Sequence, residues 1–215
     1  QFNKTIFKRI KIIEPGTLST LNLTNFKFNI LDVKLIHNHV DEREFNRNLR
    51  RKEDDLVEEL DFLFRKNLKE MIPENRVFAS VVSGGIDSAL ISNFICQISK
   101  PKKIISIDHV GKDRLANQII YFEKYINKKI SQYKVDMKYY YKNLIKSLNI
   151  CNSPIHSHSF VGQLIVSNKI SKSGCKALLG GEGGDELFGG YETYRQNIKD
   201  LNINYSNYTK LIEPI

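Results

Sequence analysis

The feature that most constrains the fold is the alternation of short apolar runs with amphipathic segments between residues 56 and 180. The apolar runs are rich in Val and Ile, which is typical of strands buried on both faces. They are residues 77–82 and 104–107, and two further predicted strands, residues 130–135 and 176–179, complete the alternation. The segments between them carry apolar residues at helical spacing. We therefore predict an α/β fold with a doubly wound, mostly parallel sheet and helices on both faces.

The first 40 residues follow a different pattern. Apolar and polar residues alternate on both sides of the turn signal Glu14-Pro15-Gly16, which predicts two strands joined at Pro15-Gly16. The charged stretch 41–55 has no apolar period and is predicted to be a linker. The expected organisation is a short β segment in 1–40, this linker, a main domain in 56–195 and a tail in 196–215.

Composition narrows the class of partner. The chain has 215 residues, with 41% hydrophobic and 27% charged residues, as in ordinary globular proteins. A net charge of +9 suits an anionic partner such as a nucleotide phosphate. No basic block is interleaved with aromatic residues and no apolar run approaches the ~18 residues of a membrane helix, so neither nucleic acid nor a membrane is an expected partner. Three cysteines without a CxxC pair favour a reducing compartment, and we expect the cytoplasm.

A glycine-rich loop, residues 83–88 (SGGIDS), follows the first buried strand and begins the next helix. Its glycines permit a tight turn whose N–H groups can point at one anion, which a helix N-terminus also attracts. Asp87 would repel a bare phosphate, so its presence favours a Mg²⁺ ion between them. The alternative is a simple Gly-Gly turn in which Asp87 or Ser88 caps the helix. The Walker loop and the dinucleotide fingerprint are both absent.

A second glycine-rich loop, residues 180–191 (GGEGGDELFGGY), follows the last predicted strand. Its glycines flank carboxylates that offer hard oxygen ligands. Leu187, Phe188 and Tyr191 are expected to anchor the segment in the core, and the alternative is a flexible acidic surface turn. Because both loops follow parallel strands, both are expected at the same edge of the sheet.

Together, SGGxDS and GEGxDELFGGY resemble the synthetase domain of the asparagine synthetases, glutamine-dependent amidotransferases. The nucleotide domain of that family belongs to the PP-loop ATP pyrophosphatase superfamily. The resemblance covers about residues 53–195, and more weakly residues 10–18, which are similar to the end of the family's glutaminase domain.

The resemblance implies a site for ATP and Mg²⁺. The residues implied to hold the pyrophosphate of ATP are Ser83, Gly84, Gly85, Asp87 and Ser88. Contacts to the adenosine are implied for Val82, Ile107, Gly180 and Gly181. Glu182 is implied to act in forming an acyl-adenylate, with Asp87 and Asp185 as the acidic catalytic positions beside Mg²⁺.

The implied reaction begins with attack of the aspartate side-chain carboxylate on the α-phosphorus of ATP, which releases pyrophosphate. Ammonia then displaces AMP and gives the amide. The nitrogen would come from glutamine, through a glutaminase domain in the same longer chain or in a partner. Two alternatives stay open: a related ligase acting on another carboxylate, in surface-glycan or β-lactam-type pathways, and a nucleotide-binding remnant without catalysis. A homodimer is also open.

Departures from the family predict a fragment or a reduced member. No cysteine stands at the N-terminus, and the family's Arg-x-Pro segment and active-site lysine are absent. Gly180 stands where the family usually has serine, and Asn75 and Val77 replace an Asp and a Pro. The pairs His37/His39 and His156/His158 lack a third ligand nearby in the sequence, so no metal role is expected for them.

Overall fold

The structure is a computed structural model, and it describes residues 5–13, 17–33, 42–109, 113–151 and 159–192. The chain divides into two compact units, one of Asp54–Glu192 and one of Gln1–Glu53 with Thr193–Ile215.

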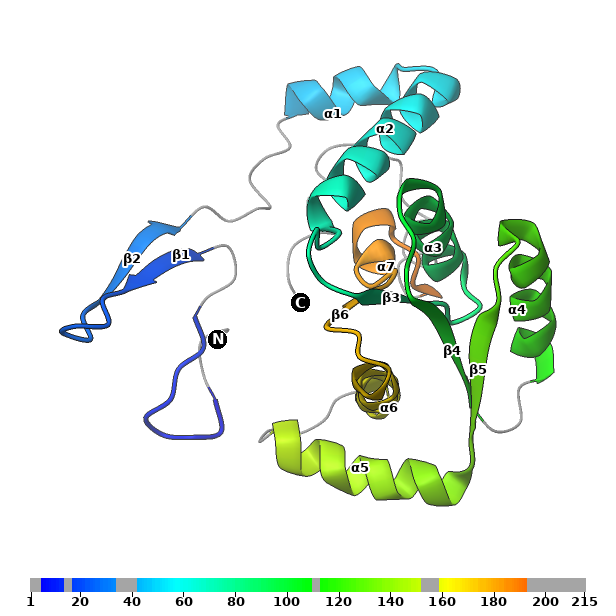
Figure 1. The fold of residues 1–215 in the computed structure, drawn as a ribbon. Coiled ribbons are helices and arrows are strands. Elements are labelled where there is room, and N and C mark those ends of the chain that lie inside the picture. The colour runs from blue at the N-terminus through cyan, green and yellow to red at the C-terminus, as the bar shows by residue number, and fades with distance from the viewer. Residues whose placement is uncertain (1–4, 14–16, 34–41, 110–112, 152–158, 193–215) are drawn as a thin grey trace. The chain divides into compact units, whose positions relative to one another are not determined.

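The larger unit is built around a parallel sheet of four strands (Figure 1). All three neighbouring strand pairs of this sheet are parallel, in the order β5-β4-β3-β6. The predicted doubly wound α/β fold is therefore confirmed. In chain order the elements are α2 (Glu53–Met71), β3 (Phe78–Val81), α3 (Ile86–Ile98), β4 (Lys103–His109), α4 (Asp113–Ile126), β5 (Ile130–Val135), α5 (Met137–Cys151), α6 (Ser159–Lys172), β6 (Ala177–Leu179) and α7 (Gly184–Phe188).

The strand order reverses between β3 and β6. From β3 the chain adds β4 and then β5 on one side, and it returns to add β6 on the other side of β3. In open α/β sheets, ligands bind outside the carboxyl ends of the strands at such a reversal point. The topology therefore directs attention to the loops that leave β3 and β6.

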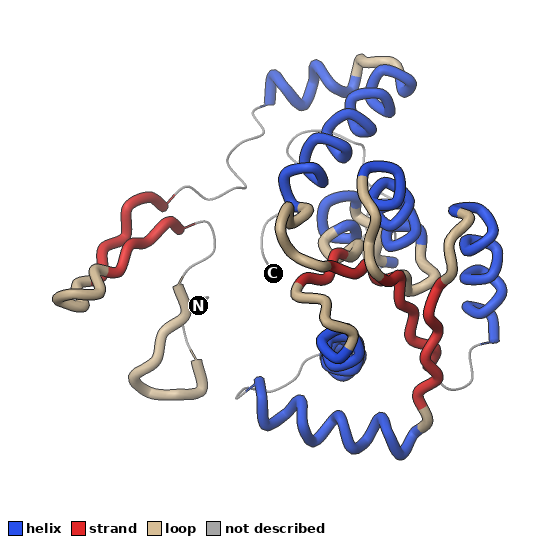
Figure 2. Tube along the Cα trace, in the orientation of Figure 1, coloured by secondary structure: helices blue, strands red, loops and turns tan. Residues whose placement is uncertain are grey.

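Helices bury both faces of the sheet (Figure 2). Neighbouring strand residues point to opposite faces: Phe78 packs against α2 and α3, whereas Ala79 packs against α6. Ile104 and Ile105 divide in the same way, toward α4 and α6. This two-sided burial explains why the strands read as continuous apolar runs.

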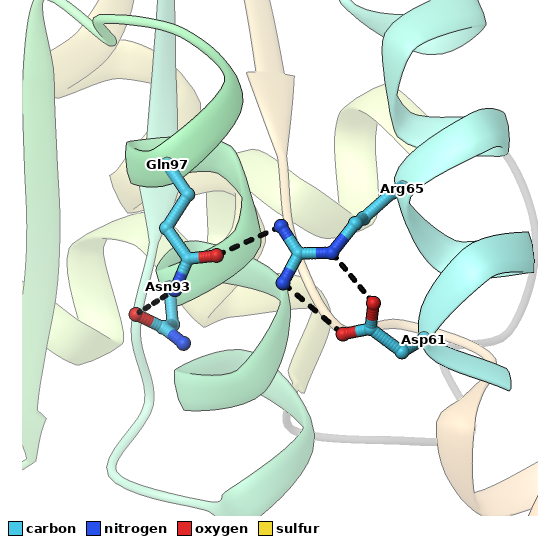
Figure 3. Close-up of polar contacts among 4 residues, drawn as sticks. All are labelled: Asp61, Arg65, Asn93 and Gln97. Atoms are coloured by element: carbon cyan, nitrogen blue, oxygen red, sulfur yellow. Dashed lines mark hydrogen bonds and ion pairs between the residues drawn. The ribbon is translucent and has the colours of Figure 1, made fainter. Parts of the chain in front are cut away.

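The side chain of Arg65 links α2 to α3 through hydrogen bonds (Figure 3). Its guanidinium donates to both carboxylate oxygens of Asp61, at 2.7 and 3.1 Å, and to Oε1 of Gln97 at 2.9 Å. It also lies 4.8 Å from the ring centroid of Phe94. The hydrogen bond between the two side chains lowers the pKa of Asp61 and raises the pKa of Arg65.

The smaller unit contains an antiparallel pair, β1 (Thr17–Leu21) and β2 (Phe28–Val33). The turn of this hairpin lies at residues 22–27. The sequence predicted a hairpin that turns at Pro15-Gly16, so the predicted position of the turn is wrong for the hairpin that the structure describes. Residues 14–16 themselves lie outside the described residues. Asn22 explains the shift, because its Oδ1 accepts the N–H groups of Thr24 and Asn25 at 2.9 and 3.3 Å. Such an Asx turn closes the hairpin without Pro or Gly.

Helix α1 (Glu42–Leu49) lies within the segment that was predicted as a linker. It has eight residues, of which only Phe45 and Leu49 are apolar, and none is buried, so no apolar period over several turns marks it in the sequence. Its charges are ordered instead. Glu42 and Glu44 lie in the first turn and Arg47 in the last, and Arg47 forms an ion pair with Glu44 at 3.3 Å. This arrangement complements the helix dipole.

Cys96, Cys151 and Cys175 are free thiols. Within the described ranges, no helix is both long enough and apolar enough to cross a membrane.

Candidate functional site

The two glycine-rich loops meet at one edge of the sheet, as predicted. β3 and β6 pair in parallel register, with Ala79 opposite Leu178 and Ser80 opposite Leu179. The loops that follow these strands therefore leave the sheet side by side. They also touch, because a Cβ atom built on Gly181 would lie 2.6 Å from the main-chain nitrogen of Ser88.

The hydroxyl of Ser88 closes the first loop on itself. Its Oγ accepts the N–H of Ser83 at 3.0 Å, donates to the carbonyl oxygen of Gly85 at 3.0 Å and lies 3.0 Å from Oγ of Ser83. Ser88 is only 7% exposed, whereas Ser83 is exposed. Ser88 therefore shapes the loop, and Ser83 is the more exposed of the two serines, with a hydroxyl that also accepts the N–H of Gly85 at 3.4 Å. Gly84 has a φ of 94°, a conformation that favours glycine.

No side chain caps helix α3. Its N-cap is Gly85, and no side chain forms a capping hydrogen bond there. The alternative in which Asp87 or Ser88 caps the helix is therefore wrong. The first amides of an α-helix have no partner within the helix, so they face outward with the positive end of the helix dipole. This is the arrangement that suits an anion such as phosphate.

The second loop forms a turn and the short helix α7 between two left-handed glycines. Gly183 precedes the helix with a φ of 92°, and Gly189 follows it with a φ of 66°. The carboxylate of Asp185 packs against Gly190, where a Cβ atom would overlap Oδ1 of Asp185. The hydroxyl of Tyr191 donates to Oε1 of Glu186 at 2.7 Å. Main-chain hydrogen bonds also order the loop, from the N–H of Gly184 to Gly181 at 3.3 Å and from the N–H of Gly190 to Asp185 at 3.0 Å.

The predicted apolar anchors of this loop are largely exposed. Leu187 is 81% exposed, Phe188 58% and Tyr191 43%, so the expectation that they fix the segment in the core is wrong. Phe188 lies against Phe64 of α2, with ring centroids 6.3 Å apart. Helix α7 has only five residues, and its glycine side lies against the first loop. Too little surface therefore remains for it to bury an apolar face as well.

The carboxylates expected to act in catalysis differ in exposure. Glu182 is exposed, whereas Asp87 and Asp185 are half-buried. The side chain of Asp87 lies against Gly184, the residue directly before Asp185; a Cβ atom there would lie 2.9 Å from Cγ of Asp87. The fold therefore brings the two predicted metal-binding segments together.

Two of the four residues predicted to contact adenosine belong to the core through their side chains. Val82 is 1% exposed and packs with Ile104 and Ile119, and Ile107 is half-buried. Only the main-chain groups of these two residues are therefore free of the core packing and open to contact with a ligand. At Gly180 a Cβ atom would lie 2.7 Å from Cγ1 of Val81, so the family's usual serine does not fit beside Val81 as this side chain is placed.

In the part of the chain that the structure describes, no group of three or more His, Cys, Asp or Glu side chains could hold a metal ion. Mg²⁺ keeps several waters and binds through one or two carboxylates and substrate phosphates, so the roles of Asp87 and Asp185 toward Mg²⁺ stay predictions. The His37/His39 and His156/His158 pairs lie outside the described residues.

Comparisons with known proteins identify the family. The asparagine synthase family model matches residues 59–212. Among solved structures, the chain is similar to an NH3-dependent NAD synthetase from Campylobacter jejuni subsp. jejuni NCTC 11168 in complex with the nitrate ion, with 14% identity and a TM-score of 0.40. That similarity covers 66% of this chain and 61% of the synthetase, so the chain spans about three fifths of that protein. No curated protein matches. The family match includes both glycine-rich loops, and the chain therefore belongs to the asparagine synthase family.

Proposed function

We propose that the larger unit binds Mg-ATP at its two glycine-rich loops and adenylates the side-chain carboxylate of aspartate, which ammonia then converts to the amide of asparagine. The contact between the two loops is the observation that carries this proposal. It places an uncapped helix N-terminus beside two acidic segments, at the point where the strand order reverses. An anion and a metal ion would then bind in one place.

Gly85 supports a phosphate-binding role for the first loop. Its φ is −81°, which any residue can adopt, and a Cβ atom would meet only Oγ of Ser83 at an ordinary 3.6 Å. Neither the backbone nor the packing requires glycine there. A ligand that approaches the main chain closely does require it. Ser83, Gly84, Gly85 and Ser88 would then surround the pyrophosphate part of ATP, while Val82, Ile107, Gly180 and Gly181 would contact adenosine through their main chains.

Asp87 and Asp185 would hold Mg²⁺. Among the described residues, neither carboxylate forms an ion pair with a basic side chain, and both are half-buried, which suits a cation as their partner. Bound Mg²⁺ would neutralise charge on the phosphates and orient them for displacement.

Glu182 would act on the reacting carboxylate. It is the third residue after β6, its side chain is exposed, and it lies between Gly181 and Gly183, so it can approach a substrate held above the strand ends. We assign it a role in forming the acyl-adenylate. A positioned charge of this kind acts by stabilising charge that develops in the transition state.

The nitrogen would be ammonia released from glutamine by a glutaminase domain, either in a longer form of this chain or in a partner. The free cysteines agree with a cytoplasmic location, which belongs to the proposal. A homodimer also belongs to it. Another carboxylate in place of aspartate, or nucleotide binding without catalysis, is distinguished by the experiment below.

The experiment has two steps. Calorimetry with ATP, in Mg²⁺ and in EDTA, is carried out on the unaltered chain, on Asp87→Asn and on Asp54→Asn, in which an exposed aspartate of α2 loses its charge. We expect Mg²⁺ to strengthen ATP binding in the unaltered chain and in Asp54→Asn, and to have little effect in Asp87→Asn. Equal gains in all three would contradict the role of Asp87. Aspartate-dependent exchange of pyrophosphate into ATP then tests adenylation; exchange with another carboxylate alone would assign a different substrate, and no exchange would indicate binding without catalysis.

A further inference from the structure

Helix α7 carries Asp185 but is too short to be stable by itself. It has five residues, whereas isolated helices shorter than about 12 residues are marginal in water. Its order therefore depends on contacts with the rest of the larger unit. At its start, the preceding turn lies against the first loop, because a Cβ atom on Gly181 would lie 2.6 Å from the main-chain nitrogen of Ser88.

The other end of α7 packs against helix α2. The ring centroids of Phe188, the last residue of α7, and Phe64 of α2 lie 6.3 Å apart, with the ring planes tilted by 38°. This separation is within the range in which aromatic pairs attract each other. Phe188 is 58% exposed, so it contacts a neighbouring helix rather than filling the core.

The ring of Phe64 is itself held in place. It stacks on the ring of Phe94 in α3, with centroids 5.7 Å apart and planes 19° from parallel. Phe94 is 6% exposed. Arg65, the next residue of α2, lies over the Phe94 ring and donates to Gln97 of α3. Phe64 therefore gives the end of α7 a fixed surface to lie on.

The same ring thus contacts the helices that belong to both glycine-rich loops. Helix α3 begins within the first loop, and α7 lies within the second. Asp185 is in the first turn of α7, about one helical turn before Phe188. If α7 tilted or unwound at Phe188, Asp185 would move relative to Asp87, the other proposed Mg²⁺ ligand.

We propose that Phe64 and Phe188 are positioning residues for Asp185, and that their contact sets the Mg²⁺ dependence of ATP binding and the rate of adenylation. This inference rests on the proposed function. Neither ring is proposed to touch ATP or the metal ion. Groups that orient a metal ligand affect metal affinity without binding the metal themselves.

The test compares Phe188→Ala with Leu187→Ala in the full chain. Leu187 is the matched control, because it is the neighbouring residue of α7 and is 81% exposed. Both changes remove a largely exposed apolar side chain from the same helix, and the ring contact with Phe64 belongs to Phe188. Calorimetry with ATP in Mg²⁺ and in EDTA, aspartate-dependent ATP–pyrophosphate exchange and thermal unfolding are measured for both.

We expect Phe188→Ala to reduce the gain in ATP affinity from Mg²⁺ about 2- to 10-fold, the scale of one aromatic pair, and the pyrophosphate exchange by a similar factor. ATP binding in EDTA should change little, because it depends on the first loop. Leu187→Ala should change none of these quantities. An unchanged gain in Phe188→Ala, or equal losses in both variants, would overturn the inference.

Substitutions in α2 separate positioning from stability. Phe64→Ala should lower the Mg²⁺ gain as Phe188→Ala does, and Phe64→Leu, which keeps an apolar side chain at the contact, should retain most of it. Leu68→Ala removes a side chain that is 5% exposed and packs in the same core cluster as Phe94. It should lower the unfolding temperature and keep the Mg²⁺ gain. An equal loss of the gain in Leu68→Ala and Phe64→Ala would show that the gain follows stability alone, against the proposal.

The double variant Phe64→Ala/Phe188→Ala tests whether the two rings act as a pair. If they act through their contact, the double variant should lose no more of the Mg²⁺ gain than either single variant. Additive losses would show that the two rings act separately, and the proposed pair would be wrong.

The position of α7 is tested without ligand by hydrogen exchange at the N–H of Gly190, which donates to the carbonyl oxygen of Asp185 at 3.0 Å. We expect faster hydrogen exchange in Phe188→Ala and Phe64→Ala than in Leu187→Ala, because local opening of α7 exposes this N–H. Unchanged hydrogen exchange in both phenylalanine variants would overturn the positioning role. Absence of Mg²⁺-dependent ATP binding in the unaltered chain would instead count against the proposed function, and the hydrogen exchange separates the two failures.

Discussion

The hydroxyl oxygens of Ser80 and Ser92 lie 2.7 Å apart in the core between β3 and α3, and both side chains are fully buried. The hydroxyl of Ser92 also lies 3.4 Å from the carbonyl oxygen of Val81, to which it can donate. These contacts join the strand before the first loop to the helix after it. They hold together the two elements that fix the ends of residues 83–85.

Ser92→Ala should destabilise the protein by about 1–3 kcal/mol, because it leaves the hydroxyl of Ser80 buried without a side-chain partner. The double variant Ser80→Ala/Ser92→Ala should cost less than the two single variants together, since no lone hydroxyl remains. Urea unfolding of the three variants measures this. Additive losses would show that the two hydroxyls do not depend on each other.

Ile95→Ala should cost about 2–5 kcal/mol, the scale for removing a large side chain from a packed core. Ile95 has no exposed surface and packs with Leu68, Phe78 and Phe94. Ile150→Ala is the comparison, since Ile150 is 64% exposed, and it should stay within about 0.5 kcal/mol of the unaltered chain. Denaturant unfolding followed by circular dichroism checks both, and similar losses would contradict the described core.

Ser88→Ala should weaken ATP binding about 5- to 10-fold, corresponding to one lost hydrogen bond of about 1–1.4 kcal/mol. The reason is that the hydroxyl closes the first loop through Ser83 and Gly85. Unlike Asp87→Asn, this change should weaken binding equally in Mg²⁺ and in EDTA. Calorimetry under both conditions distinguishes the two effects, and a loss confined to Mg²⁺ would show that Ser88 acts on the metal.

Glu182→Gln should reduce aspartate-dependent ATP–pyrophosphate exchange by about 10²-fold or more, the scale for removing one positioned electrostatic group. ATP binding should be nearly unchanged, because Glu182 is exposed and outside the first loop. Glu74→Gln removes an exposed carboxylate elsewhere and should leave the exchange intact. Unchanged exchange in Glu182→Gln would assign this residue to the turn alone.

The Asp61–Arg65 pair should make stability depend on acidic pH. The hydrogen bond from Arg65 lowers the pKa of Asp61 below its ordinary value of 3.8. A carboxyl group whose pKa is lowered by folding stabilises the folded state fully above its unfolded pKa and loses this contribution as the pH falls through the folded value. As the pH is lowered from about 6 to 2, the unfolding temperature should therefore fall less steeply in Asp61→Asn than in the unaltered chain. The effect should be small, because both side chains are well exposed.

The secondary structure of the larger unit was largely predictable because its strands are buried on both faces. The apolar run 77–82 contains β3, and the run 104–107 lies within β4. The segment 130–135 is partly polar, and it has the bounds of β5. The smaller unit was harder. Helix α1 is short and has only two apolar residues, neither of them buried, so it shows no clear helical period. The hairpin turn depends on the side chain of Asn22, which is a weaker turn signal than the nearby Pro15-Gly16.

The sequence predicted where the two loops lie in the fold, but it did not predict which of their residues touch. Two loops after parallel strands had to share an edge, and the pairing of β3 with β6 confirms it. That Gly181 and Gly184 touch Asp87 depends on distances between segments that the sequence leaves far apart. The apolar character of Leu187 and Phe188 suggested burial, but a short helix held by main-chain contacts exposes them. Roles of the site residues stay predictions.

The pairing of β3 with β6 also determines when the site can form. Ala79 finds its neighbour Leu178 only after four helices and two further strands have been made. Contacts between residues so distant in the sequence close large loops and form late and slowly in folding. On the ribosome, the nucleotide-binding loop would emerge well before the acidic loop that contacts it. An arrested or truncated chain that ends before β6 would therefore carry the complete SGGIDS motif and half of a site.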